Sequence, residues 1–170
     1  HVTKELLRHW MREDCPRRLF FCQREAVETM IYLLELAIPG RLGSTGFRNF
    51  NVDARNISKL LAGEMPDFEE LETQEFFPRL IDPAADDDLL PLRRLGCKMA
   101  TGSGKTVVMA MLIAWAFCNR GKNPASKNYS NAVLICAPNL TVRNRLQVLK
   151  PEDVDNYYDE FQIVPPRYRE

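Results

Sequence analysis

The sequence predicts an α/β fold, in which a partial parallel sheet is flanked by helices and preceded by a helical N-terminal region. Three observations support this prediction. Apolar residues recur at three-to-four spacing between Leu19 and Ile38, which is typical of a helix with one buried face. A Gly-rich turn precedes a long, apolar, helix-like segment that begins near Lys105. The run Ala132–Ala137 is continuously apolar, as in a strand buried on both faces of a parallel sheet.

Residues 1–40 are expected to form the helical N-terminal region. Lys4–Glu13 predicts a short helix that Pro16 interrupts. The longer helix covers Leu19–Ile38 and is ended by the Pro39-Gly40 pair.

Residues 41–92 are expected to form a separate, acidic segment. Arg41–Asn51 is rich in Gly, Ser and Asn and predicts a loop. Ala54–Leu61 and Pro66–Phe76 predict short helices, and Pro83–Asp88 predicts an exposed linker.

The sequence pattern of residues 93–170 predicts alternating strands and helices. Leu95–Ala100 predicts a strand, Lys105–Phe117 a helix, Ala132–Ala137 a second strand and Thr141–Leu149 a second helix. This order is a βαβα unit, which builds a parallel sheet. Two weaker patterns follow, a helix within Pro151–Phe161 and the start of a third strand at Gln162–Val164.

Length, composition and cysteine content limit the classes of protein to which the chain could belong. The chain has 170 residues, of which 45% are apolar and 27% charged, so one domain with a sizeable core is expected. No apolar run reaches the roughly 18 to 20 residues of a membrane span, and the N-terminal residues lack the pattern of a signal peptide. The five Cys are odd in number and form no C-x-x-C, which predicts a reducing, cytoplasmic location.

Charge is distributed in blocks although the net charge is zero. Between Glu64 and Asp88, ten acidic residues accompany the single base Arg79. Between Arg93 and Lys150 there are ten basic residues and no acidic one. A solvated face is the simpler explanation of the acidic block, whereas the basic block favours a phosphate-bearing partner.

The Gly-rich turn Met99–Thr106 reads Met-Ala-Thr-Gly-Ser-Gly-Lys-Thr and predicts a nucleotide-phosphate loop of the Walker A type. Glycine lets the backbone curl until several N–H groups point inward at a phosphate chain. The expected ligands of ATP are Thr101, Gly102, Ser103, Gly104, Lys105 and Thr106. Lys105 is expected to reach the β- and γ-phosphates, and the Thr106 hydroxyl to bind Mg²⁺. Met99 departs from the general pattern, which has Gly there; the alternative is a structural turn with a solvated lysine.

Three segments together resemble superfamily 2 helicases of the DEAD/DEAH type. Met99–Thr106 is similar to motif I of that family, where the first position is often not Gly. Phe20–Ala26 resembles the Q-motif, which implies that Gln23 reads the adenine edge, while Phe20 or Phe21 is a candidate for stacking on the base. Ala137–Arg143 resembles motif Ia, which implies contacts to the nucleic-acid backbone from Pro138, Asn139, Thr141 and Arg143. The alternative for that third segment is an ordinary helix cap.

The phrases around Gln23 and Lys105 most resemble the Res subunit of type III restriction enzymes. The resemblance implies a partial P-loop (RecA-like) parallel sheet in residues 93–170, truncated before motif II, and makes residues 41–92 a family-specific insertion. It implies an ATP-binding fragment of a DNA-dependent helicase-translocase, a hydrolase when whole, that works with ATP and Mg²⁺. Its partners would be duplex DNA, with RNA left open, the rest of the motor, and a methyltransferase subunit.

Motif II, an Asp-Glu pair that closes an apolar strand, is the missing part of that pattern. The one Asp-Glu pair, Asp159-Glu160, does not follow a buried strand. The fragment alone is therefore expected to bind nucleotide weakly and to hydrolyse little. Two alternatives remain, a non-catalytic nucleotide-gated binding module and a small P-loop kinase.

Overall fold

The computed structural model describes residues 1–37, 59, 95–126 and 128–169. The chain divides into two units, one of residues 1–28 and 99–170 and the other of residues 29–98. The helices predicted over Ala54–Leu61 and Pro66–Phe76, and the linker Pro83–Asp88, fall outside the described residues apart from Lys59, which is helical.

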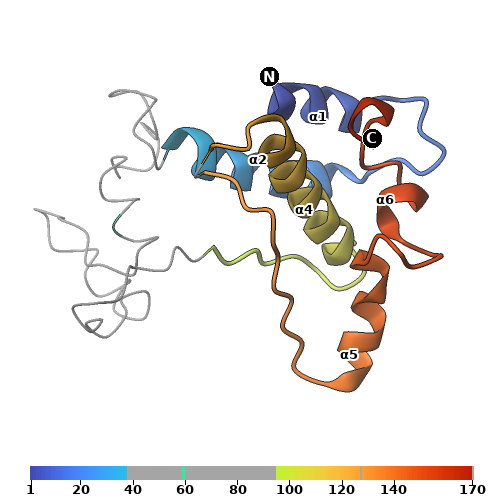
Figure 1. Cartoon of the computed structure of the whole chain (residues 1–170). Coiled ribbons are helices and arrows are strands. Elements are labelled where there is room, and N and C mark those ends of the chain that lie inside the picture. The colour runs from blue at the N-terminus through green and yellow to red at the C-terminus, as the bar shows by residue number, and fades with distance from the viewer. Residues whose placement is uncertain (38–58, 60–94, 127, 170) are drawn as a thin grey trace, which may run out of the picture. The chain divides into compact units, whose positions relative to one another are not determined.

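The regular secondary structure of the described residues is entirely helical (Figure 1). The α-helices are α1 (Val2–Trp10), α2 (Phe21–Tyr32), α4 (Lys105–Lys122), α5 (Leu140–Arg145) and α6 (Tyr157–Glu160). A π-helical turn, η1 (Leu33–Ala37), continues α2, and the 3₁₀ turns are η4 (Leu146–Leu149) and η5 (Pro166–Tyr168). None of the described helices is both long enough and apolar enough to cross a membrane.

The predicted parallel sheet is wrong, because the described residues contain no strand. Leu95–Ala100, Ala132–Ala137 and Gln162–Val164 have no regular secondary structure. A strand exists only where a neighbour accepts and donates its ladder hydrogen bonds, and a continuous apolar run says nothing about that neighbour. Val133 and Leu134, which should be buried in a sheet, are 46% and 87% exposed.

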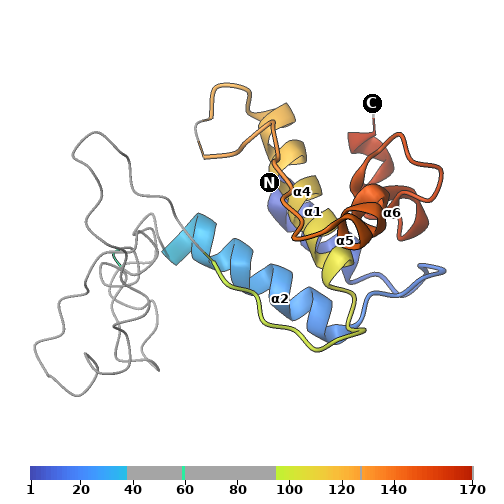
Figure 2. The same cartoon turned by 90° about the horizontal axis from the view of Figure 1, so that it is seen from below.

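The core of the first unit lies between α1 and α4, which contact each other and are close together in both views (Figures 1 and 2). Val2, Leu6 and Trp10 recur every fourth residue and form the buried face of α1. The buried side of α4 supplies the opposite half of the core, from Val107, Val108, Ala110, Met111, Ala114 and Trp115. Burial of one apolar stripe on each helix therefore fixes their pairing.

A buried polar group also joins α1 to α4. Asn119 is 1% exposed and donates from Nδ2 to Thr3 Oγ1 at 3.1 Å and to the Trp115 carbonyl at 2.9 Å. Trp115 Nε1 donates to the same Thr3 hydroxyl at 3.2 Å. α4 continues past its predicted end at Phe117. The polar Asn119 can lie in the buried helix–helix contact because its amide is hydrogen-bonded there to Thr3 and Trp115.

Replacing Asn119 by alanine should lower the free energy of unfolding by about 2 kcal/mol, because its buried side-chain hydrogen bonds to Thr3 and Trp115 are lost and a small cavity is left. Chemical denaturation measures this change. Asn144→Ala, at an exposed asparagine of α5, is the matched control and should change stability by less than about 0.5 kcal/mol. Equal losses in the two variants would contradict the structural role of Asn119.

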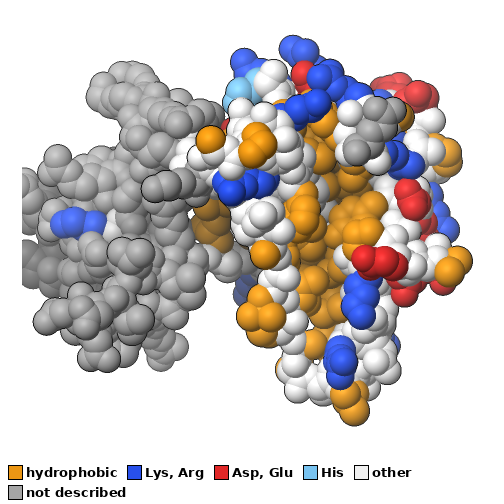
Figure 3. Space-filling view, viewed as in Figure 1, with side chains coloured by type: hydrophobic (Ala, Val, Ile, Leu, Met, Phe, Trp, Pro, Cys, Tyr) orange, Lys and Arg blue, Asp and Glu red, His pale blue; other side chains and the backbone are white. Residues whose placement is uncertain are grey.

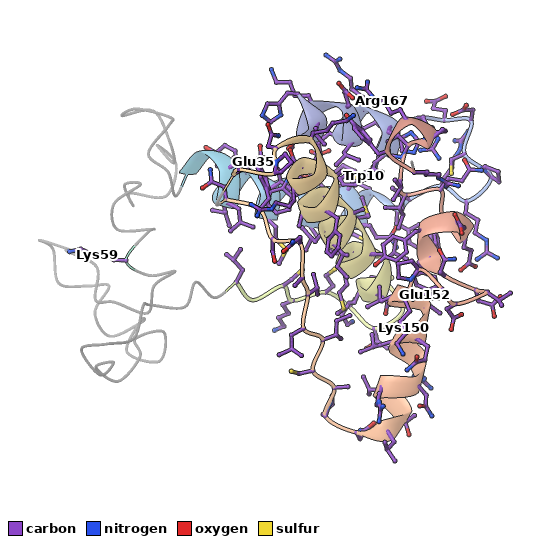
Figure 4. All side chains as sticks on the ribbon, viewed as in Figure 1. Trp10, Glu35, Lys59, Lys150, Glu152 and Arg167 are labelled. Carbon is purple, nitrogen blue, oxygen red and sulfur yellow. The ribbon has the colours of Figure 1, made fainter. Side chains whose placement is uncertain are left out.

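The C-terminal segment packs on α1 through backbone carbonyls. Trp10 Nε1 donates to the Ile163 carbonyl at 2.9 Å, and His9 Nε2 donates to the Gln162 carbonyl at 2.7 Å. Arg167 pairs with Glu5 of α1 at 2.7 Å. Figure 4 labels Trp10 of α1 and Arg167 of the C-terminal segment. The bond from Tyr168 to Glu5 is the main cause that lowers the pKa of the Glu5 carboxyl.

Burial lowers the pKa of His9 below its usual 6.5, and the neighbouring Arg12 and Arg169 act in the same direction, against the Gln162 bond and Asp14. The fold therefore favours the neutral imidazole. Its contribution to stability is complete above the pKa of the unfolded chain and is lost as the pH falls through that value toward the pKa of the folded state.

The temperature of the unfolding midpoint should therefore fall as the pH is lowered from about 7.5 to 5.5. His9→Gln keeps an N–H donor for the Gln162 carbonyl and should reduce this fall. His1→Gln, at the other histidine, should leave the fall unchanged. Identical pH profiles for His9→Gln and the unchanged protein would contradict the prediction.

Candidate functional site

The segment Met99–Thr106 forms a tight turn that ends in the first turn of α4. Gly102 and Gly104 have φ values of +79° and +81°, in the left-handed region that disfavours residues with a Cβ. Ser103 closes the turn, because its N–H and its hydroxyl both donate to the Ala100 carbonyl, at 3.4 and 2.7 Å. The two predicted glycines therefore lie where the backbone needs them.

The turn presents backbone donors. The backbone N–H groups of Gly102, Gly104, Lys105 and Thr106 donate no hydrogen bond to any described residue. Three of these residues stand at the start of α4, an 18-residue helix whose positive dipole end lies at the same point. A cluster of free N–H groups at such a position suits a phosphate group.

Lys105 folds back over the turn that precedes it. Its Nζ donates to the carbonyls of Met99 and Ala100, at 2.9 and 2.7 Å, and the side chain is exposed. The ammonium therefore lies at the mouth of the turn, held by neutral acceptors that a phosphate oxygen can replace with a stronger, charge-assisted bond. The Thr106 side chain is half-buried and next in the chain, and Thr101 is exposed on the turn.

Gln23 is joined to this turn although 80 residues separate it from Ser103. Its Nε2 donates to the Ser103 carbonyl at 3.1 Å, and its Oε1 accepts from the Phe20 N–H at 2.9 Å. The second bond caps the N-terminus of α2. Gln23 is 2% exposed, and a Cβ on Gly104 would overlap its Nε2. The structure thus brings together the Q-motif-like and motif I-like segments of one unit.

The residues predicted to contact nucleic acid lie around the start of α5. Asn139 is the N-cap, and its Oδ1 accepts from the Val142 N–H at 2.9 Å. Pro138, Thr141 and Arg143 are exposed. Within the described part of the chain, none of the ion pairs involves Arg143, Arg145 or Lys150. Asn139 therefore has a structural role, and Arg143, Arg145 and Lys150 are exposed cations that pair with no acid among the described residues.

The Asp159-Glu160 pair belongs to α6. Asp159 pairs with Arg169 at 3.2 Å, and Glu160 pairs with Arg17. Across residues 1–37, 59, 95–126 and 128–169, no three His, Cys, Asp or Glu side chains group together as metal ligands. The carboxylate expected to orient a water at the γ-phosphate is therefore not identified in the described structure.

A groove of about 1090 Å³ opens on another face of the same unit. It lies along α4, between that helix and the segments that contain η4, α6 and η5, where Figure 3 shows hydrophobic side chains gathered at the surface. Phe117, Val133, Ile135 and Tyr158 are among its lining residues. Lys150 and Glu152 lie at its edge in the segment after η4 (Figure 4). None of the predicted site residues lines it, so the groove is separate from the turn Met99–Thr106.

Sequence reasoning missed three atoms that belong to the site. The carbonyls of Met99 and Ala100 hold Lys105, and Cys22 Sγ lies 4.0 Å from the Ser103 carbonyl. Backbone carbonyls leave no pattern in a sequence. Cys22 could have been found from its position beside Gln23.

Comparison of the chain with models of protein families, with curated proteins and with solved structures found no match. The function therefore has to be argued from the site itself.

Proposed function

We propose that this chain is the ATP-binding part of a DNA-dependent ATPase, a helicase or translocase of superfamily 2 that resembles the Res subunit of type III restriction enzymes. The observation that carries the proposal is the turn Met99–Thr106. It combines two glycines at positive φ, a cluster of N–H groups at the start of α4 that bond to no described acceptor, and a lysine that folds back over the turn.

Each group of the turn has a chemical task in this proposal. The N–H groups bind the phosphate chain of ATP, and Lys105 exchanges its two carbonyl acceptors for β- and γ-phosphate oxygens. The Thr106 hydroxyl is the residue that would hold Mg²⁺, which supplies charge neutralisation at the phosphates when bound. Hydrolysis would proceed by in-line attack of water on the γ-phosphate.

The proposed nucleic-acid partner is duplex DNA, with RNA as the alternative. Its support is the charge of Arg93–Lys150, where ten bases accompany no acid, and the exposed Arg143 and Arg145 of α5. The rest of the motor and a methyltransferase subunit complete the proposal. The five cysteines are free thiols, which supports a cytoplasmic location.

The test is ATP hydrolysis by the longest natural chain that contains these residues, with duplex DNA, with RNA, and with neither. Stimulation by DNA that disappears in Lys105→Ala is expected. Arg143→Ala should weaken that stimulation and reduce the salt dependence of DNA binding by about one unit of slope. Arg8→Ala, at an exposed arginine of α1, is the matched control and should change neither.

Two results would favour the other candidates. Hydrolysis that is indifferent to DNA and RNA would favour a small P-loop kinase. Nucleotide binding without hydrolysis under any condition would favour a non-catalytic, nucleotide-gated module.

A further inference from the structure

The amide of Gln23 is already engaged on both sides. Its oxygen accepts from the Phe20 N–H at 2.9 Å, and its nitrogen donates to the Ser103 carbonyl at 3.1 Å. The side chain is 2% exposed, and it lies against Gly104 so closely that a Cβ there would overlap its nitrogen. Gln23 thus connects the N-terminus of α2 to the phosphate loop.

An amide that reads adenine must present its donor and its acceptor together to one edge of the base. In this structure the acceptor faces the backbone of α2 and the donor faces the loop, and almost none of the side chain is exposed. Turning Gln23 toward a base would break both bonds and withdraw a support from the loop that binds the phosphates.

The neighbouring aromatic side chains favour a contact that does not distinguish bases. Phe20 and Phe21 are 60% and 69% exposed, and the Phe20 N–H is bonded to Gln23, whose amide is bonded to the loop. Stacking on an aromatic ring tolerates every base, because each base has a π-face. Phosphate contacts from backbone N–H groups and Lys105 are also independent of the base.

We propose that Gln23 is a positioning residue of the phosphate loop and that this site binds nucleoside triphosphates as a class, without selecting adenine. This inference rests on the proposed function, since it concerns the same nucleotide site. It differs from the expectation of an adenine-reading glutamine in one measurable respect, the ratio of affinities for ATP and GTP.

The experiment measures the affinities of the whole chain for non-hydrolysable analogues of ATP, GTP and CTP in the presence of Mg²⁺. The ATP and GTP analogues should bind within about 3-fold of each other, which is less than 1 kcal/mol of discrimination. Gln23→Glu keeps an acceptor for the Phe20 N–H but places a carboxylate against the Ser103 carbonyl. It should weaken all analogues by about 10-fold and leave their ratios unchanged.

Gln147→Glu is the matched control, because Gln147 also donates its amide to a backbone carbonyl, that of Arg143, and lies outside the loop. It should leave all affinities unchanged. Gln23→Ala provides a second variant, and circular dichroism reports whether each variant is folded.

A preference for the ATP analogue of more than about 10-fold that Gln23→Ala removes would overturn the inference and leave the nucleotide site standing. Failure of every analogue to bind the folded, unchanged chain would overturn the proposed function, and the inference with it.

Discussion

Lys105→Ala is expected to weaken binding of a Mg²⁺-bound ATP analogue by about 100-fold or more. The Lys105 ammonium donates to the Met99 and Ala100 carbonyls at the end of the turn, and in the proposed site it would exchange them for at least two phosphate oxygens. Each hydrogen bond to a charged group contributes about 1.5–3 kcal/mol. Isothermal titration calorimetry on the folded chain measures the loss directly.

Lys122→Ala is the control for the charge alone. Lys122 lies at the opposite end of α4, where its ammonium is 5.8 Å from the centre of the Tyr168 ring. Its removal should change nucleotide affinity by less than about 2-fold, as expected for a distant, screened charge. Similar affinities for Lys105→Ala and the unchanged chain would remove the basis of the nucleotide site.

Gly104→Ala is expected to have the second largest effect, a loss of nucleotide affinity of about 100-fold. The φ of +81° costs an alanine about 1–2 kcal/mol. The new Cβ would also displace the Gln23 amide, which is enclosed and cannot move without losing its bonds to Ser103 and Phe20. The same titration measures the affinity, and thermal unfolding measures the stability.

Two further glycines separate the causes. Gly102→Ala has a similar φ of +79° but nothing within 4 Å of its Cβ, so it should lose only about 10-fold in affinity. Gly121→Ala lies within α4, with open space around its Cβ, and should raise stability by about 0.5–1 kcal/mol without affecting binding. Equal affinities for Gly102→Ala and Gly104→Ala would show that the contact between Gly104 and Gln23 does not contribute to nucleotide affinity.

Local features of the site were predictable because they depend on a few adjacent residues. The positions of Gly102 and Gly104 followed from the needs of a tight turn, and the helix expected from Lys105 is present from that residue. Its end was misplaced by five residues, at Phe117 rather than Lys122. The partner of Asn119 is Thr3, and no local pattern links residues so far apart.

The sheet failed as a prediction for a related reason. An apolar run such as Ala132–Ala137 reports that its side chains avoid water, not which backbone would pair with it. The contact between α1 and the C-terminal segment was equally hidden, because Trp10 and His9 bond to carbonyls that every residue carries. Long-range backbone pairing was therefore the part of the fold that sequence reasoning could not supply.

The two carbonyl acceptors of Lys105 also bear on how quickly a nucleotide would leave the proposed site. The oxygens of Met99 and Ala100 lie 2.9 and 2.7 Å from Nζ. If the turn binds nucleotide as proposed, these oxygens would receive the ammonium when a diphosphate departs, so that no unpaired cation is left behind. Departure would then be an exchange of one set of oxygens for another, and we expect this exchange to speed product release.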